Sequence, residues 1–127
     1  MKVQILIDNP NSWIIPYAKK LISKIEKKID SKVNLIFSSY TISQIKNLDE
    51  VFKAINIVLD EKGMFILEDP SLLECLKKNT YDQFYNEHIY VFSYIALANI
   101  LKKHDLTIFR VENISIHGGS CRYFVKR

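Results

Sequence analysis

Short apolar runs rich in β-branched residues alternate along this chain with longer segments of helical periodicity, and this alternation limits the possible folds more than any other feature. The runs lie at residues 3–7, 33–37 and 64–67. Each is bounded by turn-forming or polar residues, which is typical of buried strands. Strands separated by helices predict an α/β fold with a mostly parallel sheet.

Helical patterns occupy the segments between these runs. Apolar residues recur at three- and four-residue intervals over residues 13–28, after the capping residue Ser12, and again over residues 48–58. The sequence Glu61-Lys62-Gly63 predicts the end of the second helix, because glycine is favoured just past a helix C-terminus. Ser71 predicts the start of a short third helix.

The last third of the chain predicts one more helix, over residues 94–103, and two strands. The strands, residues 106–111 and 121–125, are joined through His117-Gly118-Gly119-Ser120. A hairpin after alternating strands and helices predicts a three-layer sheet whose last strand is antiparallel. No repeat or linker divides the chain, so residues 1–127 are expected to form a single domain.

Composition and charge exclude several classes of protein. The 127 residues are 48% hydrophobic, which is enough apolar material for a packed core. The net charge is +4, but the 18 basic residues are scattered among 14 acidic ones. The densest group has helical spacing, which favours a solvated helix face over a nucleic-acid interface: Lys19, Lys20, Lys24, Lys27 and Lys28. We expect no nucleic-acid partner.

The cysteines and the first residues indicate a reduced, cytoplasmic setting without a metal or a membrane. Cys75 and Cys121 form no metal-binding pair. The apolar run at residues 3–7 is too short for a signal peptide or a membrane span. We therefore expect a cytoplasmic protein that contacts no membrane.

Two motifs carry a resemblance to a known family. Residues 81–93 read YDQFYNEHIYVFS, and residues 117–122 read HGGSCR. In this order they resemble the C-terminal part of S-adenosylmethionine-dependent C-methyltransferases that act on nucleotide-linked deoxysugars. The resemblance covers about residues 33–127. It implies an incomplete class I methyltransferase fold, which is Rossmann-like.

The resemblance also implies a chemistry and a set of site residues. A base removes the proton from a sugar carbon beside a ketone, hydrogen-bond donors hold the enolate, and the carbon takes the methyl group from the sulfonium. The implied catalytic residues are Tyr85, Glu87, His88 and His117, and the implied substrate-binding residues are Tyr81, Tyr90, Gly118 and Gly119. Gly118 and Gly119 are explained equally well as a tight hairpin turn.

The cofactor implied by the resemblance is S-adenosylmethionine, but no residue can be assigned to it. Class I methyltransferases hold the cofactor with a glycine-rich turn after the first strand, and the three glycines here, Gly63, Gly118 and Gly119, stand elsewhere. Tyr40 stands where relatives carry a smaller polar residue, so its ring is expected to fill part of the cofactor space. Asn86 replaces the histidine or aspartate that precedes the Glu-His pair in many relatives.

The first 30 residues are similar to a different family. Residues 5–17 read ILIDNPNSWIIPY and resemble the opening strand and helix of amino-sugar formyltransferases. This similarity predicts that residues 1–32 have a separate origin from residues 33–127.

Three functional hypotheses follow. The first is a truncated methyltransferase of nucleotide-sugar or surface-polysaccharide metabolism, inactive alone, whose substrate class is a nucleotide-linked sugar. The second is a noncatalytic interaction or remnant domain. The third is one half of a split enzyme, completed by a protein partner that supplies the missing cofactor half.

Overall fold

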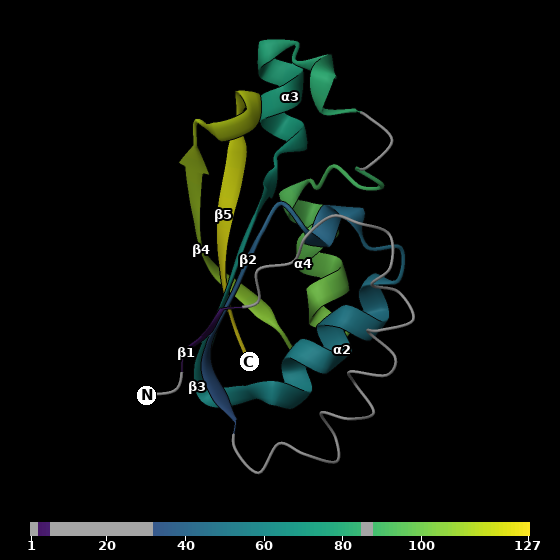
Figure 1. Cartoon of the computed structure of the whole chain (residues 1–127). Helices are drawn as coiled ribbons and strands as arrows, with labels where there is room; N and C mark the ends of the chain where they lie inside the picture. Colours follow the sequence, from purple (N-terminus) through teal and green to yellow (C-terminus); the bar gives the residue numbers. More distant parts are fainter. Residues whose placement is uncertain (1–2, 6–31, 85–87) are drawn as a thin grey trace.

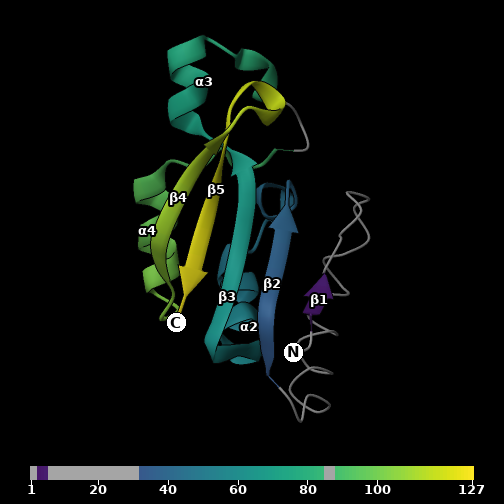
Figure 2. The same ribbon diagram turned by 90° about the vertical axis from the view of Figure 1, so that its left-hand side faces the viewer.

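Five strands form one mixed sheet in the order β1-β2-β3-β5-β4 (Figures 1 and 2). The computed structural model describes residues 3–5, 32–84 and 88–127. The strands are β1 (Val3–Ile5), β2 (Val33–Ser39), β3 (Leu59–Pro70), β4 (Thr107–Ile114) and β5 (Ser120–Lys126). The pairs β1–β2 and β2–β3 are parallel, whereas β5 is antiparallel to both β3 and β4. The predicted α/β fold with an antiparallel final strand is therefore confirmed.

Two helices cover one face of this sheet. They are α2 (Leu48–Val58) and α4 (Tyr94–Lys102), which both lie behind the sheet in the view of Figure 2. A shorter helix, α3 (Leu72–Lys78), lies beyond the carboxyl end of β3. Three 3₁₀ turns complete the described part: η1 (Ile42–Gln44), η2 (Tyr81–Gln83) and η3 (Ile116–Gly118). In the part of the chain that the structure describes, no helix is long and apolar enough to span a membrane.

Polar side chains cap the start of α2, α3 and α4. Asn47 accepts a hydrogen bond from the Glu50 amide at the start of α2, and Ser93 accepts one from the Ala96 amide at the start of α4. The prediction that Ser71 begins a helix is confirmed, because its hydroxyl accepts from the Glu74 amide. Each cap satisfies an amide that has no partner within the helix, so the sequence itself fixes where the helices begin.

The core lies between the two helices and the strands β2, β3 and β5. Alternate residues of a strand point to the same face, and the inward set on β3 and β5 is fully buried: Phe65, Leu67, Tyr123 and Val125. The helices contribute Phe52, Leu97 and Leu101, which are also fully buried. His104 joins the helices at the rim of this core, where its Nε2 lies 2.9 Å from a carboxylate oxygen of Asp49.

The predicted end of the second helix is wrong. Helix α2 ends at Val58, and β3 begins at Leu59, whose backbone is already extended. Gly63 therefore lies inside a strand, next to the irregular pairing of β2 and β3 between Val33 and Leu35. A Cβ on Gly63 would come within 2.8 Å of the Leu59 side chain and 3.0 Å of the Val33 carbonyl oxygen. Close approach of two backbones, not a helix terminus, requires the glycine.

The other predicted elements agree with the structure where it describes them. The second strand, the short helix after Ser71, the helix from Tyr94 and the final hairpin all form. β1 confirms the beginning of the first predicted strand. The helix predicted over residues 13–28 lies outside the described residues.

Replacing Gly63 by alanine should destabilise the fold. The added methyl group meets the Asp60 and Val33 carbonyl oxygens as well as the side chain of Leu59, and strained insertions of this kind cost about 1–3 kcal/mol. We expect a lower urea midpoint for Gly63→Ala, measured by circular dichroism. Lys62→Ala is the matched control, because Lys62 is exposed on the same strand. Equal midpoints for the two variants would contradict the close packing.

Candidate functional site

Polar side chains gather where the parallel strands end. β2 ends at Ser39 and Tyr40 follows it, β3 runs through Glu68 and Asp69, and β5 starts at Ser120 at the same edge. In open α/β sheets, ligands bind at the carboxyl ends of the strands. We therefore take this edge as the candidate functional site.

Tyr40 closes the site against the loop between β4 and β5. Its hydroxyl donates a hydrogen bond of 3.0 Å to Oγ of Ser120, and its ring meets the His117 ring edge-on with centroids 4.4 Å apart. Burial raises the pKa of the Tyr40 phenol above its usual value. Tyr40 also has a positive φ of 53°, which is unfavourable for a residue with a side chain. Contacts that outweigh this strain must hold the ring in place.

The loop that carries His117 is a run of left-handed residues. His117, Gly118 and Gly119 have φ values of 49°, 74° and 133°. A Cβ on Gly119 would come within 2.7 Å of Glu74 in α3, and one on Gly118 within 3.3 Å of Thr80. Turn geometry, together with the close approach of Gly119 to α3 and of Gly118 to Thr80, therefore accounts for both glycines. Their contact with a substrate stays a prediction.

His88 is oriented by the backbone. Its Nδ1 lies 2.9 Å from the carbonyl oxygen of Gln83. A carbonyl oxygen can only accept a hydrogen bond, so Nδ1 carries a proton, and in the neutral ring the lone pair is on Nε2. This is the tautomer that a general base attacking through Nε2 requires.

The remaining predicted site residues differ in their surroundings. Tyr90 donates a hydrogen bond of 2.8 Å to the Lys46 carbonyl and stacks on Phe92, so its ring is anchored by the fold. Tyr81 lies on the surface with 67% of its area exposed. Tyr85 and Glu87, together with Asn86, lie outside the described residues.

A row of charged side chains crosses β3, β5 and β4 on the face of the sheet away from α2 and α4. Glu68 accepts hydrogen bonds from Nε of Arg122 and from the Ser39 hydroxyl, and Arg122 also reaches Glu112 on β4. The Glu68 side chain is only 6% exposed, and the hydrogen bond that it accepts from Arg122, together with its charge, raises the pKa of Arg122. Sequence reasoning missed this row. The available signal was an acid, Glu68, near the end of β3 and a base, Arg122, in β5. The sequence does not show that these two residues lie opposite each other, because that depends on the register of the two strands.

Asp69 is the most unusual group at this edge, and sequence reasoning missed it as well. Its side chain is completely buried, and neither carboxylate oxygen has a hydrogen-bond partner among the described residues. Burial raises the pKa of Asp69 to about 7, although the neighbouring Ser43 opposes the rise. Near neutral pH the carboxyl group is therefore only partly ionised.

Replacing Asp69 by asparagine should change how stability depends on pH. The folded protein binds this proton up to about pH 7, whereas the unfolded chain releases it near pH 4. The wild type thus loses stability as pH rises from 4 to 7, by roughly 4 kcal/mol at most. Asp69→Asn should lack this loss and exceed the wild type in urea midpoint at pH 8.

The advantage of Asp69→Asn should shrink steadily as pH falls towards 5, because the wild-type carboxyl group is then protonated. Asp105→Asn is the matched control, since Asp105 is exposed and asparagine tolerates its positive φ. A constant difference between Asp69→Asn and the wild type at all pH values would contradict the raised pKa.

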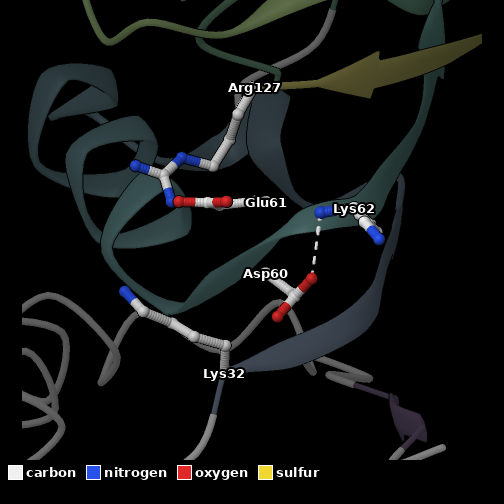
Figure 3. A pocket seen from close by; sticks show the side chains of 5 residues that line it. All are labelled: Lys32, Asp60, Glu61, Lys62 and Arg127. Atoms are coloured by element: carbon white, nitrogen blue, oxygen red, sulfur yellow. Dashed lines mark hydrogen bonds between the residues drawn. The ribbon is translucent and has the colours of Figure 1, made fainter.

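A hollow lies at the opposite edge of the sheet (Figure 3). Its volume is about 450 Å³, and it is lined by Lys32, Asp60, Glu61, Lys62 and Arg127. Glu61 and Arg127 point towards each other, and the Lys62 amide donates to the Asp60 carboxylate. Three bases thus stand against two acids in this lining, and every site residue predicted from the motifs lies elsewhere in the sequence.

No cluster of three or more metal-binding side chains occurs among residues 3–5, 32–84 and 88–127. Cys75 and Cys121 are both buried and unbridged. The Cys121 thiol lies 3.3 Å from the Asn113 amide oxygen, across the β4–β5 pair.

Comparison with known proteins gives the family. Residues 8–111 match the family described as "Methyltransferase domain". This chain belongs to that family. The C-methyltransferase NovU of Streptomyces niveus is 31% identical over 90 residues, which cover 71% of this chain. The family match begins inside the segment likened to formyltransferases, and that second resemblance gains no support from it.

Solved structures agree on the fold. An S-adenosylmethionine-dependent methyltransferase from Clostridium acetobutylicum superimposes with a TM-score of 0.58 at 18% identity, covering 78% of this chain and 60% of the other. A second match, with a TM-score of 0.60 at 10% identity, is a chain in the complex between the Haloferax volcanii Trm112 methyltransferase activator and the putative methyltransferase. That match covers 76% of this chain and 55% of the other.

This chain spans only part of these relatives. It covers 21% of the length of the Streptomyces niveus C-methyltransferase. The activity, substrate and partners of the whole relative are therefore treated below as proposals.

The described residues at the end of β2 do not by themselves build a cradle for S-adenosylmethionine. Their polar groups are used within the chain: Thr41 donates to the Ser39 carbonyl, Gln44 donates to the Tyr40 carbonyl, and Tyr40 donates to Ser120. Gly63 lies within β3, and the other two glycines form the loop before β5. That the cofactor site is incomplete in this chain stays a prediction, because residues 6–31, which follow β1, lie outside the described residues.

Proposed function

We propose that this chain supplies the substrate side of an S-adenosylmethionine-dependent C-methyltransferase acting on a nucleotide-linked sugar. The printed function of the 31% identical relative supports C-methyl transfer. The observation that carries the proposal is the orientation of His88, whose Nδ1 proton is bound to the Gln83 carbonyl. This leaves Nε2 as the basic nitrogen of the neutral ring.

In this proposal His88 removes the proton from the sugar carbon beside the ketone. Glu87 and Tyr85, its neighbours in the motif, would support the base and donate to the enolate oxygen. His117 would be a further polar contact. Gly118 and Gly119 would let the substrate approach the backbone closely, because they carry no side chain. Tyr81 and Tyr90 would form part of the sugar-binding wall.

We further propose that another polypeptide holds the methyl donor. S-adenosylmethionine would supply an electrophilic methyl group to the carbanion, but the end of β2 offers it no cradle. One structural neighbour was solved as a complex with a methyltransferase activator, so a second chain bound to this fold has a precedent. The sugar-metabolism role, including surface polysaccharides, rests on the motif resemblance alone.

A noncatalytic role is the second candidate, and one contact favours it. The rings of Tyr40 and His117 touch, and the Tyr40 hydroxyl is bound to Ser120. This arrangement fills space at the carboxyl ends of the strands. If Tyr40 stays in place, the edge of the sheet binds no large ligand, and the chain serves as an interaction domain.

Proton exchange separates the two candidates without the cofactor. A nucleotide-linked ketosugar incubated with the chain in heavy water should exchange the hydrogen beside its ketone, as followed by proton NMR. We expect His88→Gln to slow this exchange by about 10²–10⁴-fold, the usual contribution of a general base. His104→Gln is the control, because His104 is bound to Asp49 at the rim of the core. Equal rates with wild type, His88→Gln and buffer would favour the noncatalytic role.

Calorimetry tests the proposed lack of a cofactor site. When the wild-type chain is titrated with S-adenosylmethionine, we expect no binding tighter than a dissociation constant of about 1 mM. This limit corresponds to a binding free energy of roughly −4 kcal/mol. Saturation at micromolar cofactor would show that this chain holds the methyl donor unaided, and the partner would then be unnecessary.

A further inference from the structure

The outer edge of β4 is exposed. β4 is the last strand of the sheet order, and no described strand pairs with its far side. Phe109 and Val111 on this strand are 50% and 40% exposed. A free edge strand offers unpaired amides and carbonyls to another strand, and proteins commonly cover or charge such an edge.

Strand geometry restricts how β4 could pair with itself. Along a strand, the backbone N–H and C=O groups of successive residues point alternately to one neighbouring strand and to the other. In an antiparallel pair, two opposite residues therefore either both point these groups towards the partner strand or both point them away. Two copies related by a two-fold axis can therefore pair only with the axis at a residue, not between two residues. Near the middle of the exposed strand, the possible centres are Arg110, Val111 and Glu112.

Charge selects one of these three registers. Centring on Arg110 places two arginines directly opposite each other, and centring on Glu112 does the same with two glutamates. Like charges in opposite positions destabilise a pair of strands. Centring on Val111 instead places Arg110 of each copy opposite Glu112 of the other, so both cross-strand pairs are attractive and add to the ion pair that Arg110 and Glu112 form within each chain.

The Val111 register also extends a charge pattern already present in the sheet. Glu68 lies opposite Arg122, and Arg122 lies opposite Glu112. These residues alternate in sign across three strands and are joined by ion pairs. Arg110 of a second copy would continue the row beyond Glu112 with the sign that the alternation requires.

Helix α4 enlarges the surface beside this edge. It contacts β4 and lies next to it in Figure 2. Two of its first residues, Tyr94 and Ile95, are 52% and 71% exposed. A β-bulge between Ile108 and Arg110 interrupts the strand, so the regular ladder available for pairing begins at Arg110.

We propose that β4 pairs with β4 of a second copy, antiparallel and about a two-fold axis at Val111, so that one continuous sheet crosses both chains. Such an interface is isologous, because the same residues of each copy meet. It is independent of the catalytic proposal, since none of the predicted site residues lies on β4.

Sedimentation measures the association directly. The wild-type 127-residue chain should show a concentration-dependent monomer–dimer equilibrium in analytical ultracentrifugation between about 1 and 500 μM. Arg110→Glu gives each copy two acids at the pairing positions, and Val111→Lys places two lysines on the axis. Each should weaken the dimer by at least about tenfold, equivalent to 1.4 kcal/mol. Thr107→Lys, exposed on the same strand but outside the regular ladder, should leave it unchanged.

Mixing two charge variants tests the register itself. Arg110→Glu carries two acids at the pairing positions and Glu112→Lys carries two bases, so neither should pair with itself. An equimolar mixture should form a heterodimer, because each acid then faces a base. Thermal unfolding of each variant shows whether Glu112→Lys, which also loses its ion pairs with Arg122 and with Arg110 of its own chain, remains folded. If it does not, Arg110→Glu and Val111→Lys carry the test.

Two results would overturn the proposal. One is a wild-type chain that stays monomeric throughout the concentration range. The other is a dimer whose affinity is unchanged by Arg110→Glu and Val111→Lys, because its interface would then lie elsewhere.

Discussion

The antiparallel insertion of β5 between β3 and β4 is the constraint on which the rest of the structure depends. It buries Tyr123 and Val125 against the helices and makes β5 a central strand instead of an edge. Because β5 runs opposite to its neighbours, its first residues lie at the carboxyl ends of β2 and β3. The loop before β5 therefore reaches the same edge as Tyr40 and Glu68, and the polar groups of the candidate site come together there.

Two features of this edge carry an energetic cost that the rest of the fold offsets. Tyr40 and His117 both hold positive φ angles, and Asp69 is buried with no hydrogen-bond partner for its carboxyl oxygens in the part of the chain that the structure describes. Strain and unsatisfied polar groups are concentrated at functional sites in many proteins. Both occur at this edge, although Asp105 also has a positive φ and Asn56 Oδ1 in α2 also lacks a hydrogen-bond partner among the described residues.

The same register that places Arg122 beside Glu68 and Glu112 connects the site to the edge of the sheet. Arg122 bridges two acids on the strands that flank it. Charged residues in this row lie on the face away from α2 and α4, so they tie the three strands together without entering the core. The ion-paired row of Glu68, Arg122 and Glu112 therefore links the candidate site to the exposed edge strand β4, although the roles proposed for the two regions differ.

The sequence by itself determined the class of fold and most of the elements. Alternating strand and helix patterns depend on residues close together in the chain, so β2, α2 and the final hairpin could be read from periodicity, and the start of α3 from its capping serine. The end of α2 could not, because Gly63 serves a contact with Val33 on another strand, thirty positions earlier. In the sequence, a glycine that ends a helix cannot be distinguished from a glycine that lets two strands approach closely.

Only the tertiary structure decided which polar groups meet at the site. The motifs predicted His88 and His117 as site residues, but the tautomer of His88 depends on the Gln83 carbonyl, and the surroundings of His117 depend on Tyr40 from a distant strand. Glu68, Asp69 and Arg122 drew no functional prediction, because burial and cross-strand register give them their properties. Periodicity is local, whereas pairing, desolvation and charge contact arise between segments that the chain separates by tens of residues.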